Sequence, residues 1–143
     1  MRISAKAEYA CVAMLELAAN YREPQPLRVK VIAETQGIPQ RFLVQILLQL
    51  KSGGLVGSLR GALGGYQLAR PPDKISLADV INAIERTPAE RPTLIPMKGS
   101  QAIHVLHGVW KEMQEAEQRA LETLTLAELV RRAQQTYALT YQI

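Results

Sequence analysis

The sequence predicts a mainly α-helical fold with one small β-hairpin, arranged as a winged helix-turn-helix followed by a long C-terminal helix. Two short helical patterns meet at residues 36–39, which is typical of a helix-turn-helix. A hairpin pattern with glycines at its tip follows over residues 55–69, and a long helical pattern covers residues 101–124. We therefore expect three regions, which are a winged helix-turn-helix at 1–85, a loop at 86–100 and a helical part at 101–143.

The first helix is expected from Ser4 to Asn20. Ser4 suits the N-cap position, and apolar residues from Tyr9 to Leu17 recur at helical spacing. Residues 21–26 contain two prolines and are therefore predicted to form a loop.

The helix-turn-helix is expected to consist of one helix over Leu27–Gln36 and a second from Pro39 to about Ser52. Gly37 ends the first helix, and Pro39 suits the start of the second because its missing N–H costs little there. The residues predicted to face inward are Val31, Ile32 and Ala33 in the first helix and Leu43, Ile46, Leu47 and Leu50 in the second.

The wing is predicted to be an antiparallel hairpin. An extended segment over residues 55–59 leads to a glycine-bearing tip at Arg60–Gly65, and Tyr66–Ala69 returns from it. Two prolines, Pro71 and Pro72, end the hairpin.

Three further helices are predicted after the wing. Two of them begin at pairs with capping-box spacing, Ser76 with Asp79 and Thr125 with Glu128. Residues 136–143 are too short to assign. The expected helices cover Leu77–Glu85, Gln101–Leu124 and Leu126–Gln135. One side of the long helix carries Ile103, Leu106, His107, Trp110, Met113, Glu117, Ala120 and Leu124.

The net charge of +4 is unevenly distributed along the chain. Residues 1–74 carry ten Lys and Arg against five Asp and Glu, a net charge of +5, whereas the remainder carries seven basic and eight acidic residues. A basic half of this kind indicates a polyanionic partner such as nucleic acid. The aromatic content of 5% argues against an RNA binder that stacks bases on aromatic side chains.

The composition also excludes several classes of protein. A hydrophobic content of 48% is enough for a core and argues against disorder. The single cysteine, Cys11, excludes a disulfide framework and a cysteine-based metal site, and we expect it to pack in the first helix. The sequence has no signal-peptide pattern and no membrane-spanning apolar stretch, so we expect a cytoplasmic protein. An enzyme is not expected, because neither a nucleotide loop nor a nucleophile with a suitably spaced base is present.

The helix that starts at Pro39 offers a surface for reading DNA. A helix fits the major groove and reaches base edges with its N-terminal residues. The outward residues of its first two turns are Gln40, Arg41, Val44 and Gln45. Arg41 can pair with guanine or a phosphate, either glutamine can pair with adenine, and Val44 can contact a thymine methyl group.

Arg60 stands at the predicted wing tip beside Gly61. An arginine on a narrow loop can enter the minor groove, and a neighbouring glycine lets the backbone approach closely. The glycines do not form a phosphate-binding loop, since no Gly-Lys-Ser or Gly-Lys-Thr follows them. Candidate phosphate contacts are Arg2, Arg28, Lys30 and Lys51.

Six segments follow a recognisable pattern, and they are Met1–Ala10, Ile32–Ile38, Phe42–Leu50, Gly54–Val56, Arg60–Ala69 and Ile75–Ile81. Together they resemble the signature of the Rrf-type winged-helix transcriptional regulators, and the resemblance extends to about residue 130. It implies a homodimer in which the long helix crosses to its partner and two winged helices bind double-stranded DNA at a near-palindromic operator. The contacts that it implies are Arg41, Phe42, Val44, Gln45, Arg60 and Gly61. Val44 replaces the glutamate of many members, and Ala62-Leu63 replaces their Pro-Gly.

A larger departure from the family concerns the sensor. Members that bind an iron–sulfur cluster have three cysteines between the fourth helix and the long helix, and residues 86–100 contain none, so no cofactor is expected. His104 stands where the last cysteine would be, His107 matches the family's histidine and Glu8 matches its acidic position. Two imidazoles and a carboxylate would suit zinc or another divalent ion. The two histidines are equally explained as polar residues of the dimerising helix.

The leading interpretation is therefore a dimeric, sequence-specific transcriptional regulator, expected to repress by blocking polymerase on its operator. Two alternatives stay open. The first is a cluster-less regulator controlled by a docked metabolic enzyme, or by another regulatory protein or small effector. The second is a divalent-metal sensor built on His104, His107 and Glu8.

Overall fold

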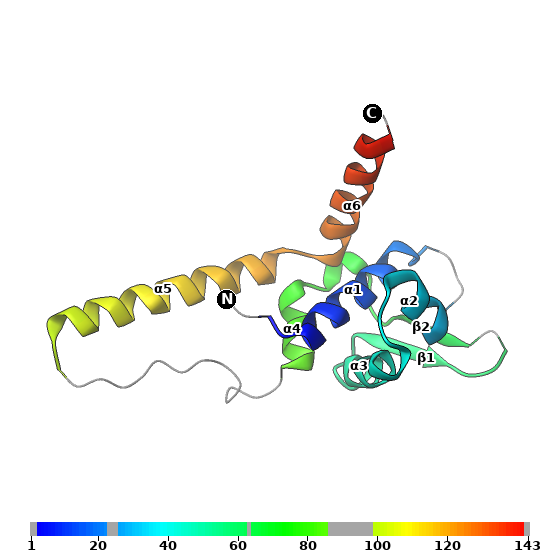
Figure 1. Cartoon of the computed structure of the whole chain (residues 1–143), viewed down its shortest axis with the longest axis horizontal. Coiled ribbons are helices and arrows are strands. Elements are labelled where there is room, and N and C mark those ends of the chain that lie inside the picture. Colours follow the sequence, from blue (N-terminus) through cyan, green and yellow to red (C-terminus); the bar gives the residue numbers. More distant parts are fainter. Residues whose placement is uncertain (1–2, 23–25, 63, 86–98, 142–143) are drawn as a thin grey trace.

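A computed structural model describes residues 3–22, 26–62, 64–85 and 99–141. The elements form one body from which two helices project (Figure 1). In chain order they are α1 (Ala5–Ala19), α2 (Val29–Gln36), α3 (Gln40–Ser52), β1 (Val56–Leu59), β2 (Gly65–Leu68), the 3₁₀ turn η1 (Pro72–Lys74), α4 (Leu77–Ile84), α5 (Gln101–Thr123) and α6 (Leu126–Tyr141). This confirms the predicted fold class, a mainly helical winged helix with a two-stranded antiparallel hairpin.

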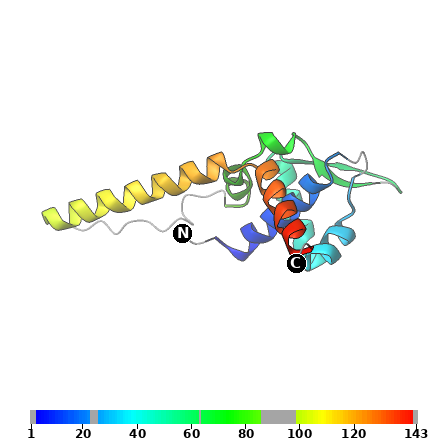
Figure 2. The same ribbon diagram turned by 90° about the horizontal axis from the view of Figure 1, so that it is seen from above.

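The body is built from α1, α2, α3, α4 and the hairpin. In both views α5 extends from it as a single straight rod (Figures 1 and 2). α6 follows the rod and contacts α1 and η1 at its base. The loop expected at 86–100 lies outside the described residues except for Gly99 and Ser100.

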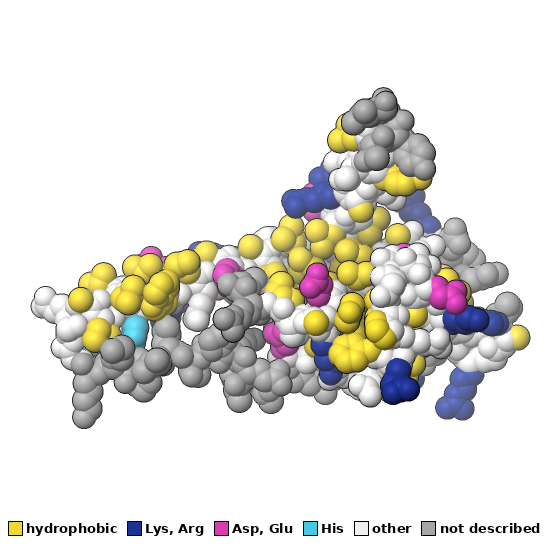
Figure 3. All heavy atoms as spheres, in the orientation of Figure 1, with side chains coloured by type: hydrophobic (Ala, Val, Ile, Leu, Met, Phe, Trp, Pro, Cys, Tyr) yellow, Lys and Arg dark blue, Asp and Glu magenta, His cyan; other side chains and the backbone are white. Residues whose placement is uncertain are grey.

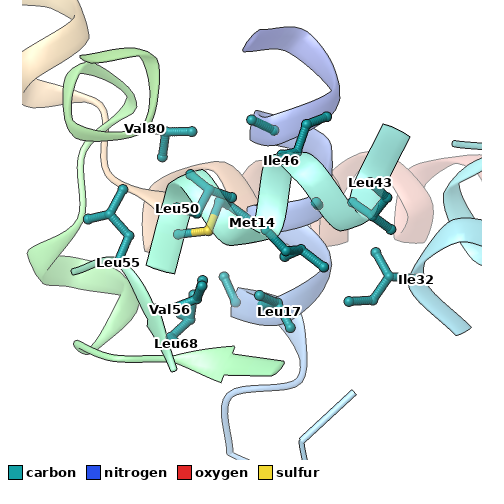
Figure 4. Close-up of a cluster of buried hydrophobic side chains, with 14 of the residues drawn as sticks. Met14, Leu17, Ile32, Leu43, Ile46, Leu50, Leu55, Val56, Leu68 and Val80 are labelled. Carbon is teal, nitrogen blue, oxygen red and sulfur yellow. The ribbon is translucent and has the colours of Figure 1, made fainter. Parts of the chain in front are cut away.

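The core is entirely apolar within the described residues, where no polar or charged side chain is buried. The four residues predicted to face inward from α3 are all fully buried, namely Leu43, Ile46, Leu47 and Leu50. They meet side chains from α1, α2, α4 and the hairpin in one cluster, of which Figure 4 labels Met14, Leu17, Ile32, Leu55, Val56, Leu68 and Val80. Burial of this face therefore fixes which face of α3 is left for solvent.

The turn between α2 and α3 forms as predicted. Gly37 closes α2 in the left-handed conformation, with φ 68°, and the next amide, that of Ile38, donates to the Ala33 carbonyl at 3.0 Å. Pro39 is the N-cap of α3, and its carbonyl accepts from the Leu43 amide at 3.0 Å. The angle between the two helices is therefore set by hydrogen bonds that the turn residues themselves make.

The start predicted for the second helix is wrong by two residues. α2 begins at Val29, and Leu27 pairs with Tyr66 of β2 in an antiparallel bridge, with N···O distances of 2.9 and 2.7 Å. The edge of β2 offers these backbone groups partners that a first helical turn would not. Val31 is also misassigned, since it is 44% exposed while the next residue, Ile32, is buried. One helical step turns a side chain by about 100°, which separates these two neighbours.

The body is closed by a contact between residues far apart in sequence. The Leu77 amide donates to the Leu124 carbonyl and the Leu126 amide to the Ile75 carbonyl, both at 2.9 Å. The predicted capping box of α4 lies beside this bridge, since Ser76 and Asp79 exchange hydrogen bonds of 3.0 and 3.1 Å. Leu126 is fully buried in the core, so it anchors the start of α6 to the body.

α6 continues to Tyr141, six residues beyond the predicted end at Gln135. Neither glycine nor proline occurs in this stretch, so nothing in the chain stops the helix. The Thr125 hydroxyl accepts from the Glu128 amide at 3.2 Å as a cap should. The Glu128 carboxylate binds the two arginines of the next turn instead of completing the box, and the Arg131 hydrogen bond lowers the pKa of Glu128 to about 2.

We expect Leu126→Ala to lower the free energy of unfolding by about 2–5 kcal/mol, because it leaves a cavity where α6 enters the core. Chemical denaturation measures this. Leu139→Ala is the matched control, since Leu139 lies on the same helix and is 63% exposed. Equal losses in both variants would show that Leu126 does not anchor α6.

Candidate nucleic-acid interface

The outer face of α3 is the first part of the site. Gln40, Arg41, Val44 and Gln45 are all exposed, on the side of the helix opposite its buried leucines. Because the buried face is held by the core, these side chains are presented on a rigid element. The structure thus brings together the four α3 residues that the sequence singles out for base contacts.

Phe42 occupies a different position on the same turn. It is 39% exposed, and its ring meets the ring of Tyr9 edge to face, with centroids 5.8 Å apart and planes at 76°. Phe42 therefore ties the N-terminal turn of α3 to α1. Tyr9 was predicted only as part of an apolar stripe, and no local signal in the sequence indicates this pairing.

The wing is the second part of the site. β1 and β2 pair with Val56 opposite Leu68 and Leu59 opposite Gly65, and exposed Arg60 follows β1 directly. Gly61 has φ 105°, which favours glycine, and its carbonyl accepts from the Gly64 amide at 3.0 Å. A Cβ on Gly64 would lie 2.3 Å from the Leu59 carbonyl oxygen, so the tip requires a glycine at this position.

Several of the predicted phosphate contacts surround this surface. Lys and Arg side chains lie over α3 and the hairpin on the face shown in Figure 3. Lys51 donates to the Ser58 hydroxyl of β1 at 2.8 Å, and the Arg28 guanidinium donates to the Ala62 carbonyl at the wing tip. Lys30 is exposed on α2, and Arg2 lies outside the described residues.

The predicted metal ligands do not form a group in one chain. Glu8 lies in the first turn of α1, whereas His104 and His107 lie in the first two turns of α5, the end of the rod farthest from the body (Figure 1). The described residues contain no cluster of three or more His, Cys, Asp or Glu side chains that could hold a metal ion.

Cys11 is half-buried on α1 and is held as a neutral thiol. Burial, aided by the negative charges of Glu8 and Glu85, raises its pKa from 9.0 to about 11. Glu85 is itself fixed by the N-cap of α1, since its carboxylate accepts from the Ser4 hydroxyl at 3.0 Å. A thiol in this state is a poor metal ligand at neutral pH, because the thiolate is the form that binds metal.

α5 presents a long apolar face to solvent. None of its residues is buried, and an apolar strip follows its first half (Figure 3). The exposed fractions run from 41% at Trp110 to 68% at Val105, with Leu106, Val109 and Met113 between them. An exposed apolar patch of this kind marks a protein interaction surface.

A cavity of about 430 Å³ lies between α1, α6 and the end of α2. Its apolar walls come mainly from Val12, Leu15, Leu129 and Val130. Glu16 lies at its edge and accepts a hydrogen bond of 2.7 Å from Gln36, the last residue of α2. Its volume is in the range of small-ligand sites, and it connects α6 to the helix-turn-helix.

The fold and this surface define a winged helix-turn-helix protein of the DNA-binding class, in which an exposed helix and a basic wing lie side by side. The family described as "Rrf2: Iron-dependent Transcriptional regulator" matches residues 3–132. The chain therefore belongs to the Rrf2 family of transcriptional regulators, as the sequence signature predicted.

Individual relatives agree with this assignment. Protein Rrf2 of Nitratidesulfovibrio vulgaris is 34% identical over 135 residues, which cover 93% of this chain and 89% of that protein. Among solved structures, CymR, the global cysteine regulator of B. subtilis, matches with a TM-score of 0.80 and 32% identity over 92% of this chain and 98% of CymR. IscR of T. potens matches with a TM-score of 0.76 and 33% identity, covering 93% and 88% of the two chains.

These relatives are regulators, so the family assignment confirms that the chain is not an enzyme. Among the helices that the structure describes, none combines the length and apolarity needed to cross a membrane. The donor set present does not suit the iron chemistry in the family's description, because residues 86–100 contain no cysteine and the Cys11 thiol is protonated.

The raised pKa of Cys11 gives a pH dependence with a definite sign. The unfolded chain loses the thiol proton near pH 9, whereas the folded protein keeps it to about pH 11. The folded state therefore binds more protons in this window, and the free energy of unfolding should fall as the pH rises through it.

Denaturation curves between pH 8 and about pH 11 test this. Cys11→Ala is the control, because it removes only this titration from the other groups that titrate there. A fall of equal steepness in both proteins would show that the thiol is not perturbed.

Proposed function

We propose that the protein is a homodimeric repressor that reads a near-palindromic operator with α3 and the wing. The observation that carries the proposal is the outer face of α3, whose four exposed side chains lie beside a wing that ends in Arg60. A helix of this size fits the major groove, and the wing then reaches the adjacent minor groove.

The residues of α3 divide by chemistry. Arg41 pairs with guanine or a phosphate, Gln40 and Gln45 offer amides to adenine, and Val44 packs on a thymine methyl group. Phe42 contributes through its contact with Tyr9, which fixes the angle of the helix at the groove. A valine at position 44 cannot accept a hydrogen bond from cytosine as a glutamate can, so the operator should differ from that of glutamate-bearing members.

The wing supplies a different kind of contact. Arg60 enters the minor groove, where negative potential is concentrated, while Gly61 lets the backbone come close to the sugar-phosphate chain. Lys30, Lys51 and Arg2 are proposed to contact phosphates and so to set register and the salt dependence of binding.

Dimerisation is proposed to occur through α5. A rod without a single buried residue and with an apolar strip needs a partner to cover it, and a second copy provides the same strip. Two winged helices related by a two-fold axis would then read two half-sites, which explains a near-palindromic operator. Such a dimer represses by occupying the DNA that polymerase requires.

The signal that controls the protein stays a prediction. Control by a small effector is supported by the cavity between α1 and α6, since it touches Gln36 at the helix-turn-helix. Control by a docked metabolic enzyme or other regulatory protein, and a metal site at His104, His107 and Glu8, have no supporting contact in the described residues of one chain.

The first experiment tests the wing. The operator is identified by sequencing DNA that copurifies with the protein, and Arg60→Ala should then weaken binding about 5- to 150-fold and reduce the salt slope by about one. Fluorescence anisotropy at several salt concentrations measures both. Arg131→Ala is the matched control, because Arg131 lies on α6 in an ion pair with Glu128. Operator affinity equal to the wild type in Arg60→Ala would exclude the wing from the interface.

The second experiment tests the dimer. Trp110→Glu places a charge in the apolar strip of α5 and should convert the protein to a monomer in sedimentation, with loss of operator binding. Lys111→Glu changes charge at the neighbouring exposed position and should leave the dimer intact. A dimeric Trp110→Glu variant would contradict the assignment of this face.

A further inference from the structure

Arg28 sits where the helix-turn-helix meets the wing. It is the N-cap of α2, and its guanidinium donates to the carbonyl of Ala62 at the wing tip, 34 residues further along the chain. The residue before it, Leu27, forms the two backbone hydrogen bonds with Tyr66 of β2. The chain entering α2 is thus bonded to both the middle and the tip of the wing.

The approach of this segment to the wing is too close for an ordinary side chain. A Cβ on Gly65 would lie 2.4 Å from the Leu27 carbonyl oxygen and 3.0 Å from the Arg28 amide nitrogen. On the opposite edge of the hairpin, Lys51 of α3 holds Ser58 of β1. The strands are therefore fastened on both edges, whereas the contacts printed by the tip itself are short, as in the Gly64 to Gly61 bond.

We infer that Arg28 is a positioning residue that holds the wing tip, so that Arg60, two residues before Ala62, is directed towards DNA. The inference rests on the proposed role of the wing in operator binding. A glycine-bearing tip that is free to move loses conformational entropy when it enters a groove. A guanidinium bonded to its backbone restricts the tip before binding and so reduces that cost.

This role differs from that of a phosphate contact, which the sequence alone suggested for Arg28. A phosphate contact acts by its charge, independently of the wing, and its loss lowers the salt slope by about one. A positioning residue acts only through the wing, so its removal has no further effect once Arg60 is gone. The two roles therefore predict different coupling with Arg60.

A double-mutant cycle on operator affinity separates them. Arg28→Ala should weaken binding about two- to tenfold with the salt slope unchanged, and should add nothing in the Arg60→Ala background. Lys30→Ala is the comparison, because Lys30 is an exposed cation on the same helix; it should lower the slope by about one and multiply with Arg60→Ala. Multiplicative effects of Arg28 and Arg60, or a lower slope in Arg28→Ala, would overturn the inference.

A measurement without DNA keeps the inference distinct from the proposed function. Amide hydrogen exchange at Gly61, Ala62 and Gly64 should be faster in Arg28→Ala and in Arg28→Met, which keeps most of the aliphatic stem, than in Lys30→Ala. Unchanged exchange in both Arg28 variants, with thermal unfolding as in the wild type, would overturn it. If exchange rises but Arg60→Ala binds operator normally, the fastening holds and the proposed role of the wing fails.

Discussion

The packing of α3 against α1 is the constraint on which the rest of the structure depends. α1 buries Ala7, Ala10 and Ala13 completely, and these short side chains let neighbouring helices approach its axis closely. The leucines and isoleucine of α3 fill the adjoining space, so α3 cannot roll without opening a cavity. The polar face is thus defined by what the apolar face must bury. Tyr9 and Phe42 complete the contact at the end that meets DNA.

What the sequence could predict follows the range of the interactions involved. The inward face of α3, the Gly37 turn and the capping box at Ser76 depend on neighbours within a few residues, and all were predicted correctly. The pairing of Leu27 with Tyr66 and the bond from Arg28 to Ala62 span more than 30 residues, so no local pattern indicates them. The true end of α6 was missed for a different reason, because its last turns carry no apolar periodicity or stop signal.

The candidate site shows the same division. The exposure of Arg41, Gln45 and Arg60 follows from helix periodicity and hairpin pattern, so the sequence identified the side chains that face outward. It could not identify which of the other cations are already engaged within the protein. Arg28 and Lys51 are bonded to the wing, while Lys30 is exposed in the same region. Positive charge near a DNA-reading helix therefore serves two purposes, attraction of the polyanion and internal bracing.

The bridge between residues 75–77 and 124–126 has a consequence for how the chain can change over evolution. The chain leaves the body after α4 and re-enters it beside the start of that same helix, so everything between is an excursion with adjacent ends. A segment of this kind can be lengthened, shortened or exchanged without moving its attachment points. The rod and the segment before it could thus diverge in chemistry while the DNA-reading body kept its geometry.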